Sequence, residues 1–103
     1  MKRALITGIY GQDGSYLAEL LKENGYEIHG AVQENFSSNS IKIKEYLNTN
    51  NVVNFEHIVD LNDYSSLKNI LIKINPDEIY HMAAIHVSSE SGKNSINNEA
   101  QLF

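Results

Sequence analysis

The sequence predicts an α/β protein built on a parallel β-sheet, and three observations support this. A short apolar run at residues 4–6 leads directly into three closely spaced glycines and then into an amphipathic segment. Strand-like and helix-like segments then alternate along the 103 residues in the order β-α-β-α-β-α-β. Because parallel strands need helical crossovers, this order predicts the N-terminal half of a doubly wound parallel sheet, with spatial strand order 3-2-1-4.

The first half of the chain supplies two strands and two helices. Residues 4–6 predict the first strand, and a helix is expected from residue 13 or 14 to residue 24, where Asn24-Gly25 is a good helix stop. The apolar residues of this helix are expected on one face, and they are Tyr16, Leu17, Leu20 and Leu21. Residues 26–32 predict the second strand. A polar loop at 33–40 and a short helix at 41–47 follow.

The second half continues the alternation. After a turn at 48–51, β-branched residues predict the third strand over 52–59. Asn62 or Asp63 is expected to cap a helix that runs to residue 74, ahead of Pro76. Its expected buried stripe is Tyr64, Leu67, Ile70, Leu71 and Ile74. Residues 78–82 predict the fourth strand, 83–93 a serine-rich loop, and 94–103 the start of a further helix.

The three glycines are placed as a phosphate-binding turn requires. Gly8 allows a backbone conformation that a side chain disfavours. Gly11 leaves room for a pyrophosphate to approach the main chain, and Gly14 allows the new helix to pack closely on the strand. The helix N-terminus then offers unpaired N–H groups to an anion. The alternative is a glycine-rich turn without a ligand, but the strand before it and the helix after it favour a dinucleotide.

The residues around this turn resemble a known family. Thr7-Gly8 and the run Gly11-Gln12-Asp13-Gly14-Ser15-Tyr16-Leu17 closely resemble the N-terminus of GDP-mannose 4,6-dehydratases, which are extended short-chain dehydrogenases/reductases. The segments 25–30 and 76–80, Asp60-Leu61 and Ala83-Ala84 resemble the same family. The resemblance implies a Rossmann-like fold and a coenzyme site. Its implied residues are Gly8, Gly11, Gln12, Asp13, Gly14, Asp60, Leu61, Ala83 and Ala84.

Position and resemblance together suggest roles for two of these pairs. Asp60 follows the third strand, at the sheet edge where ligands bind, so its carboxylate can accept from the adenine amino group and the Leu61 N–H can donate to a ring nitrogen. Ala83-Ala84 would let the coenzyme lie against the backbone. The following loop departs from the family pattern, although His86, Ser88 and Ser89 could approach the nicotinamide or the substrate.

The identity of the coenzyme depends on the end of the second strand. An acidic residue there binds a ribose hydroxyl, as in NAD, whereas arginine accommodates the 2′-phosphate of NADP. The family typically carries Arg-Arg and uses NADP, but this chain has Gln33-Glu34. The resemblance therefore implies NADP, with Lys42 or Lys44 reaching in, and the local charge leaves NAD as the alternative.

Two other patterns have simpler readings. Tyr64-x-x-x-Lys68 matches the catalytic signature of the superfamily, but it lies before the fourth strand instead of after the fifth. We interpret Tyr64 as a core residue and Lys68 as a solvated one. His81, His86 and Glu90 could be imagined as metal ligands, but loop and core roles are favoured, and we expect no metal site.

Composition restricts the partners. The net charge is −5 with no basic cluster, which argues against nucleic acid and anionic membranes. There are no cysteines, and no stretch suits a signal peptide or a membrane span, so a cytoplasmic location is expected.

The resemblance implies a lyase that dehydrates GDP-mannose to its 4-keto-6-deoxy form. The complete enzyme would use a GDP-sugar substrate and could form a homo-oligomer. The required Thr/Ser, Glu and Tyr-Lys residues belong to the second half of the fold, so no catalytic residue is expected in this chain. It is interpreted as one dinucleotide-binding domain over residues 1–103, apparently truncated. The alternatives are a non-catalytic dinucleotide-binding module or inactive fragment, and a related epimerase or reductase.

Overall fold

The computed structural model describes residues 1–34 and 37–82 and contains a four-stranded parallel sheet. Its strands are β1 (Arg3–Thr7), β2 (Glu27–Val32), β3 (Phe55–Ile58) and β4 (Glu78–His81), in the spatial order β3-β2-β1-β4. This order and the parallel register confirm the predicted topology. The helices are α1 (Gln12–Glu23), α2 (Ser38–Thr49) and α3 (Tyr64–Ile74).

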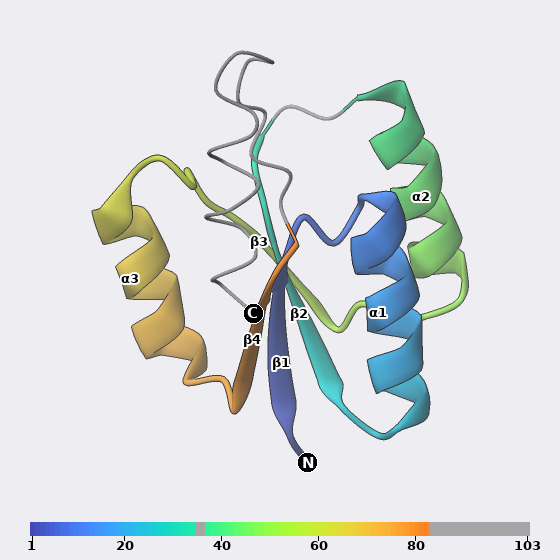
Figure 1. Ribbon diagram of the computed structural model, residues 1–103, viewed down its shortest axis with the longest axis horizontal. Helices are drawn as coiled ribbons and strands as arrows, with labels where there is room; N and C mark the ends of the chain where they lie inside the picture. Colours follow the sequence, from blue (N-terminus) through green and yellow to red (C-terminus); the bar gives the residue numbers. More distant parts are fainter. Residues whose placement is uncertain (35–36, 83–103) are drawn as a thin grey trace, which may run out of the picture.

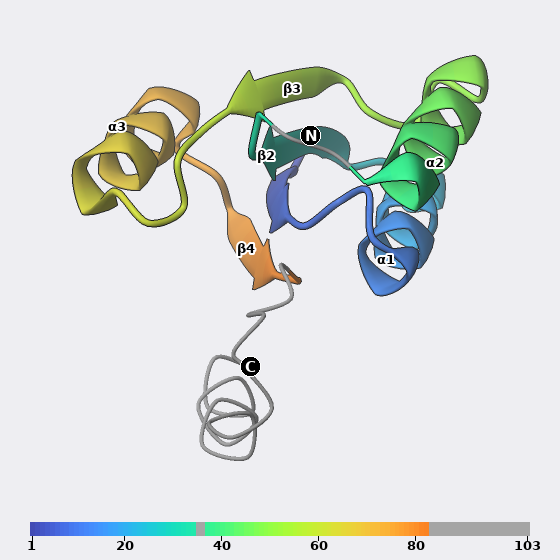
Figure 2. The same ribbon diagram turned by 90° about the horizontal axis from the view of Figure 1, so that it is seen from above.

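The helices cover opposite faces of the sheet (Figures 1 and 2). Of the described helices, α1 and α2 lie on one face and α3 lies on the other. This arrangement follows from the right-handed crossovers that join parallel strands, because the chain moves from β1 toward β3 and then returns past β1 to β4. None of the helices in the described ranges is long and apolar enough to cross a membrane.

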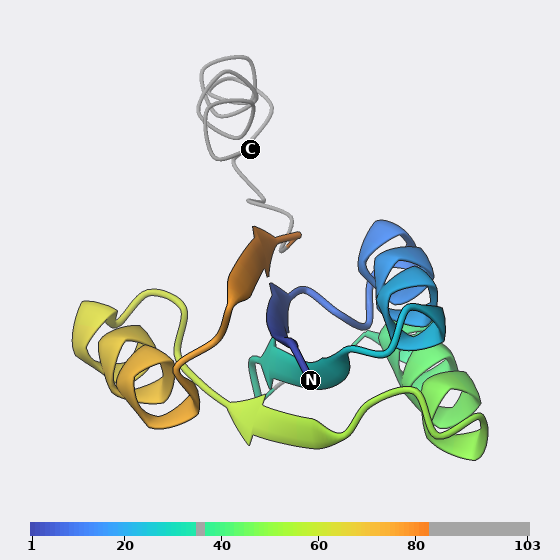
Figure 3. The same ribbon diagram turned by 90° about the horizontal axis from the view of Figure 1, so that it is seen from below.

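Alternating side chains of the strands divide the core into two parts. Ala4, Ile6 and Ile28 face α1 and α2, in a cluster that also buries Ala18 and Leu47. The α3 face holds a smaller cluster of Leu5, Ala31, Val59 and Ile74. The view from below shows the sheet between these helical layers (Figure 3).

The four apolar residues expected on one face of α1 do not all contact the core. Tyr16 is 63% exposed and Leu20 is 55% exposed. The helix instead buries Gly14, Ser15, Ala18 and Leu21 against the sheet. The small residues Gly14, Ser15 and Ala18 let the helix approach the sheet closely, and Tyr16 and Leu20 lie on a different, exposed side of the helix.

The role predicted for Tyr64 as a core residue is also wrong. Tyr64 is the first residue of α3, and its side chain is 78% exposed. The contacts of α3 with the sheet come from its second half, through Ile70, Leu71 and Ile74. Tyr64 shares their helical spacing but lies in the first turn, beyond the part of the helix that reaches this cluster.

Some element boundaries also differ from the predictions. α2 begins at Ser38 instead of residue 41, because the side chain of Ser37 accepts a hydrogen bond from the Ser40 N–H and caps the helix. β3 begins three residues later than predicted. Val52 is buried, but its N–H donates to the Leu47 carbonyl at the end of α2, so it finishes the helix instead of joining the sheet.

The remaining boundaries agree with the predictions to within a residue or two. Asp63 caps α3 by accepting from the Ser65 N–H, and Asn75 ends this helix in a left-handed conformation just before Pro76. The loop predicted at 83–93 and the helix start predicted at 94–103 lie outside the described residues.

Candidate functional site

The glycine turn lies at the carboxyl end of β1, where it joins the strand to α1 (Figure 1). Gly8 has a φ of +66°, a conformation that glycine adopts readily and other residues disfavour. The Gly11 N–H donates to the Gly8 carbonyl over 3.0 Å and closes the turn. The predicted reversal of the chain at Gly8 is therefore present.

Gly14 is required by the close approach of α1 to this turn. A Cβ atom at Gly14 would lie 2.2 Å from the Gly8 carbonyl oxygen, which is an impossible contact. At Gly11 the corresponding distance is 3.3 Å, so a Cβ atom there needs a shift of only a few tenths of an ångström. The two glycines thus differ in kind, because the fold itself excludes a side chain at Gly14 much more strongly than at Gly11.

The N-terminus of α1 is open toward solvent. Gly11 is its N-cap and offers no side chain to the first N–H groups of the helix. Gln12 and Asp13 form the exposed first turn beside it. An uncapped helix N-terminus next to an accessible glycine turn can accept an anionic group, because its N–H groups and the helix dipole both favour negative charge.

A buried tyrosine in the turn anchors it to the rest of the sheet. The Tyr10 hydroxyl donates a hydrogen bond to the Glu56 carboxylate on β3, and the Lys44 ammonium of α2 lies 3.1 Å from the same carboxylate. Burial and the bond to Glu56 raise the pKa of Tyr10 well above its ordinary value. Burial alone would raise the pKa of Glu56, but the bonds from Tyr10 and Lys44 lower it overall.

A second contact restricts the turn from below. Ile9 is fully buried, and a Cβ atom on Gly30 of β2 would lie 2.8 Å from an Ile9 methyl group. Sequence analysis missed Tyr10, Glu56 and Gly30 as parts of the site. No local pattern marks them, because each depends on a contact between segments that are far apart in the chain.

A pocket of about 310 Å³ lies at the carboxyl ends of β2 and β3. Its described lining consists of Gln33, Glu34, Ile58, Val59, Asp60 and Asn62. Asp60 is held in place because its carboxylate accepts from the Asn62 N–H and its own N–H donates to the Ser66 hydroxyl. The structure thus brings Asp60 together with Gln33 and Glu34. The Leu61 side chain is partly buried and packs against the core cluster on the α3 face.

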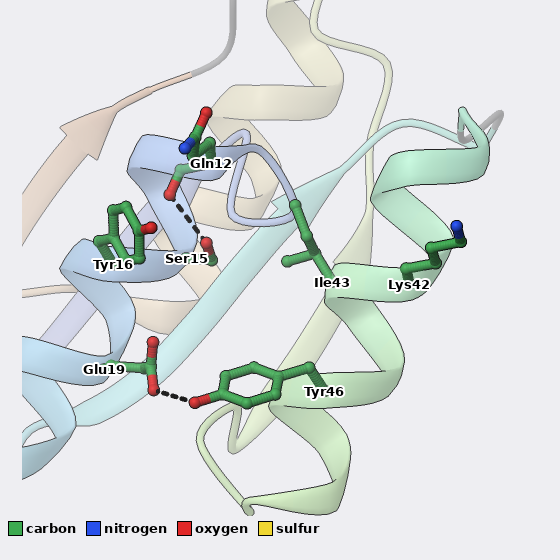
Figure 4. Close-up of a pocket in the computed structure, with 7 residues that line it drawn as sticks. All are labelled: Gln12, Ser15, Tyr16, Glu19, Lys42, Ile43 and Tyr46. Atoms are coloured by element: carbon green, nitrogen blue, oxygen red, sulfur yellow. Dashed lines mark hydrogen bonds between the residues drawn. The ribbon is translucent and has the colours of Figure 1, made fainter.

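A second groove, of about 290 Å³, separates α1 from α2 (Figure 4). It begins at Gln12 and Ser15 next to the glycine turn and extends to Glu19 and Tyr46, whose hydroxyl donates to the Glu19 carboxylate over 2.8 Å. The bond to Glu19 raises the pKa of Tyr46. Lys42 is also on the rim, but its ammonium points away from Gln12 and Ser15.

The end of β4 is described only as far as Met82. His81 lies beside Thr7, and the His81 Nδ1 and Thr7 Oγ1 atoms are 2.8 Å apart. Several residues given roles above lie outside the described residues, so the structure does not test those roles. They are Ala83, Ala84, His86, Ser88, Ser89 and Glu90. Tyr64 and Lys68 are exposed on α3, on the opposite face of the sheet from α1.

A parallel sheet of order 3-2-1-4, with a glycine turn between β1 and α1, defines a Rossmann-like nucleotide-binding fold. The model of the family described as GDP-mannose 4,6 dehydratase matches residues 5–99, so this chain belongs to that family.

Individual relatives agree with this assignment. The chain is 47% identical over 97 residues to the GDP-mannose 4,6-dehydratase of Yersinia enterocolitica. The matched region covers 88% of this chain and 26% of that relative. It is 48% identical over 86 residues to the human GDP-mannose 4,6 dehydratase. This match covers 79% of this chain and 23% of the human protein. The chain thus spans about a quarter of the length of these relatives.

A solved structure with a similar fold carries a coenzyme. The UDP-glucuronic acid 4-epimerase of Bacillus cereus, in complex with NAD, superimposes with a TM-score of 0.60 and 26% identity, over 92% of this chain and 31% of that one.

Proposed function

We propose that this chain supplies the coenzyme-binding part of a GDP-mannose 4,6-dehydratase. The single observation that carries the proposal is the turn from Gly8 to Gly14, which ends at an uncapped helix N-terminus on the ligand-binding edge of the sheet. Family membership and the NAD complex of the Bacillus cereus epimerase support the same assignment. The pyrophosphate of a nicotinamide dinucleotide would bind at Gly11, Gln12, Asp13 and Gly14.

The adenine end would occupy the pocket between β2 and β3. Asp60 would accept from the adenine amino group, and the Leu61 N–H would donate to a ring nitrogen. Asp60 suits this role because only one of its carboxylate oxygens has a hydrogen bond, to the Asn62 N–H, within the described part of the chain. Ala83 and Ala84 would lie along the coenzyme at the end of β4. The family resemblance implies NADP, and the acidic end of β2 favours NAD.

In the complete enzyme, the bound nicotinamide would supply reversible hydride transfer. The sugar of GDP-mannose would lose a hydride from C4 and a proton from O4, then water across C5–C6, and it would regain a hydride at C6 and a proton at C5, so that only water is lost overall. The residues of this chain would bind and orient the coenzyme. By themselves, residues 1–103 are not expected to convert GDP-mannose, because the proton-transfer residues of the family lie in the second half of the fold.

Replacement of Gly11 by valine tests the proposal. Gly11 has ordinary negative φ, and the fold leaves 3.3 Å for a Cβ atom, so Gly11→Val should fold. Its branched side chain would occupy the path of the pyrophosphate. Calorimetric titration with NADH and NADPH should show binding to the natural chain and a loss of at least tenfold in the variant.

A valine far from the turn provides the control. Asn69 is exposed on α3, so Asn69→Val adds the same side chain without touching the site. Circular dichroism should show the same fold for both variants. Unchanged affinity in Gly11→Val, or no binding by the natural chain, would contradict the proposed site.

A further inference from the structure

Every charged residue that lines the pocket at the ends of β2 and β3, within the described ranges, is acidic. Glu34 follows β2, Asp60 follows β3, and Gln33 and Asn62 are the polar neighbours. We propose that this pocket selects NAD over NADP, with the Glu34 carboxylate accepting hydrogen bonds from the adenosine ribose hydroxyls. This preference presupposes the dinucleotide site proposed above, and it departs from the coenzyme that the family resemblance implies.

The electrostatic reason is the charge on a 2′-phosphate. A phosphate monoester carries about two negative charges near neutral pH. Glu34 and Asp60 would face this group with two more negative charges, and like charges held close together repel one another. A ribose with free hydroxyls has the opposite preference, because it needs an acceptor, and an acidic residue about twenty positions after the glycine turn supplies one.

Neither the segment after β2 nor the described lining of the pocket offers a cation to offset this repulsion. Residues 33–41 contain neither lysine nor arginine. Lys44 is held by Glu56 on the face of the sheet covered by α1 and α2, where its ammonium also lies 5.8 Å from the Tyr10 ring centre. Lys42 lies on the rim of the groove between α1 and α2 and points away from Gln12 (Figure 4). Neither lysine lines the pocket that holds Glu34.

The N-terminus of α2 is the other group that could receive a phosphate, and it already has an internal acceptor. The Ser37 hydroxyl oxygen accepts from the Ser40 N–H over 3.1 Å, as in a capped helix. A 2′-phosphate would have to displace this bond while remaining near Glu34. The capped helix therefore gives NADP no ready substitute for arginine.

Equilibrium binding of four ligands tests the preference. NADH and NADPH would be titrated by fluorescence into residues 1–103, and 5′-AMP and adenosine 2′,5′-bisphosphate would be titrated by calorimetry. The second pair isolates the adenosine end and differs only in the 2′-phosphate. We expect the natural chain to bind the ligand without this phosphate at least tenfold more tightly in both pairs.

Glu34→Arg should abolish or reverse the preference for the ligands without the 2′-phosphate. It should do so by strengthening the binding of the 2′-phosphorylated ligands at least tenfold. Glu34→Gln, which removes only the charge, should reduce the ratio of the affinity without the 2′-phosphate to the affinity with it. Glu45 is exposed on α2 and lines neither pocket, so Glu45→Arg changes the net charge equally and should leave the ratio unchanged within about twofold. Because Glu34 is an exposed loop residue, these variants should keep the fold.

The outcomes separate the two proposals. If neither nicotinamide dinucleotide binds, the proposed coenzyme site is wrong. If both bind and NADPH binds as well as NADH or better, the site stands and the selection of NAD is overturned. The selection of NAD by Glu34 is also overturned if Glu45→Arg changes the affinity ratio as much as Glu34→Arg does, because the effect would then reflect net charge alone.

Discussion

Gly14 shows how strongly one missing side chain can matter. Within a helix, alanine is intrinsically about 1 kcal/mol more favourable than glycine. At this position, however, a Cβ atom would meet the Gly8 carbonyl oxygen at 2.2 Å. Overpacking of this kind typically costs about 1–3 kcal/mol, and a backbone atom cannot move aside as a side chain can. The steric term should therefore exceed the helical gain.

We expect Gly14→Ala to lower the free energy of unfolding by about 2 kcal/mol or more, as measured by urea denaturation. Asn69→Ala on the exposed face of α3 is the matched control and should stay within about 0.5 kcal/mol of the natural chain. A Gly14→Ala variant as stable as the natural chain would show that the turn and α1 can separate freely.

The role of Tyr10 in holding the glycine turn could not be predicted from the sequence. The glycine spacing predicted the turn because φ, ψ and close approach depend on neighbouring residues. The bond from Tyr10 to Glu56 joins positions 46 residues apart, and the ion pair with Lys44 comes from a third element. A side chain whose role depends on such distant partners leaves no local pattern.

At the scale of elements, the order and type of all seven helices and strands in the described residues could be predicted, but the faces of the helices could not. Apolar periodicity reports which side chains are hydrophobic. It does not report how closely a helix approaches a sheet, and α1 buries Gly14 and Ala18 in preference to Tyr16 and Leu20. Likewise, β-branched residues predicted a long β3, yet Val52 completes the end of α2.

A series of hydrogen-bonded side chains connects β2 and β3 on the α3 face of the sheet. His29 on β2 is only 6% exposed, and its Nε2–H donates a hydrogen bond to the Glu27 carboxylate, with 2.7 Å between Nε2 and the carboxylate oxygen. The other nitrogen, Nδ1, is 3.0 Å from His57 Nε2 on β3. With the Nε2–H donating to Glu27, Nδ1 is the acceptor of this pair and the His57 Nε2–H is the donor. Arg3 completes the chain, with its Nε 3.1 Å from Glu27.

This chain of bonds predicts a fold that loses stability in acid. Burial, then His29 and Lys73, lower the pKa of His57 in the folded state. The unfolded chain therefore binds more protons below about pH 6.5, so the contribution of His57 is complete above that pH and is lost as the pH falls toward its folded pKa. The bond from His29 lowers the pKa of Glu27 in the same way, which adds a further loss below about pH 4.5.

The measurement is the urea midpoint between pH 7.5 and pH 5.5. The natural chain should become less stable across this range, and His57→Gln should flatten the change because glutamine does not titrate. The variant is less stable at pH 7.5, so the slope with pH is the diagnostic quantity. An equally steep slope in His57→Gln would assign the acid sensitivity to other groups.

For the whole molecule, the two edges of the described sheet differ. β3 is tied to α2 through Glu56 and Lys44, whereas β4 pairs only with β1 among the described residues. Ile79, in the middle of β4, is 54% exposed. An edge with unpaired backbone groups and an exposed apolar side chain is a template for self-association. Residues 1–103 are therefore expected to be poorly stable and to self-associate when concentrated alone.

A charge on this edge should reduce the aggregation. Ile79→Lys is expected to lower the light scattering of a concentrated solution several-fold, because lysine on an edge strand opposes strand addition. Ile72→Lys is the control, since Ile72 is 67% exposed but lies on α3, away from any strand edge. Equal effects of the two substitutions would point to general surface hydrophobicity instead of the strand edge.

The bond between Tyr10 and Glu56 links ligand binding to local unfolding. β3 cannot separate from β2 without releasing the glycine turn, and the turn cannot reorder without releasing Glu56. A dinucleotide that fixes the turn must then also slow the opening of β3, by mass action on the closed state. Hydrogen exchange should show this at the Val59 amide, which donates to the Val32 carbonyl over 2.8 Å. Its protection should rise when coenzyme is added, and the increase should shrink in Tyr10→Phe, where the ring remains and the link is lost.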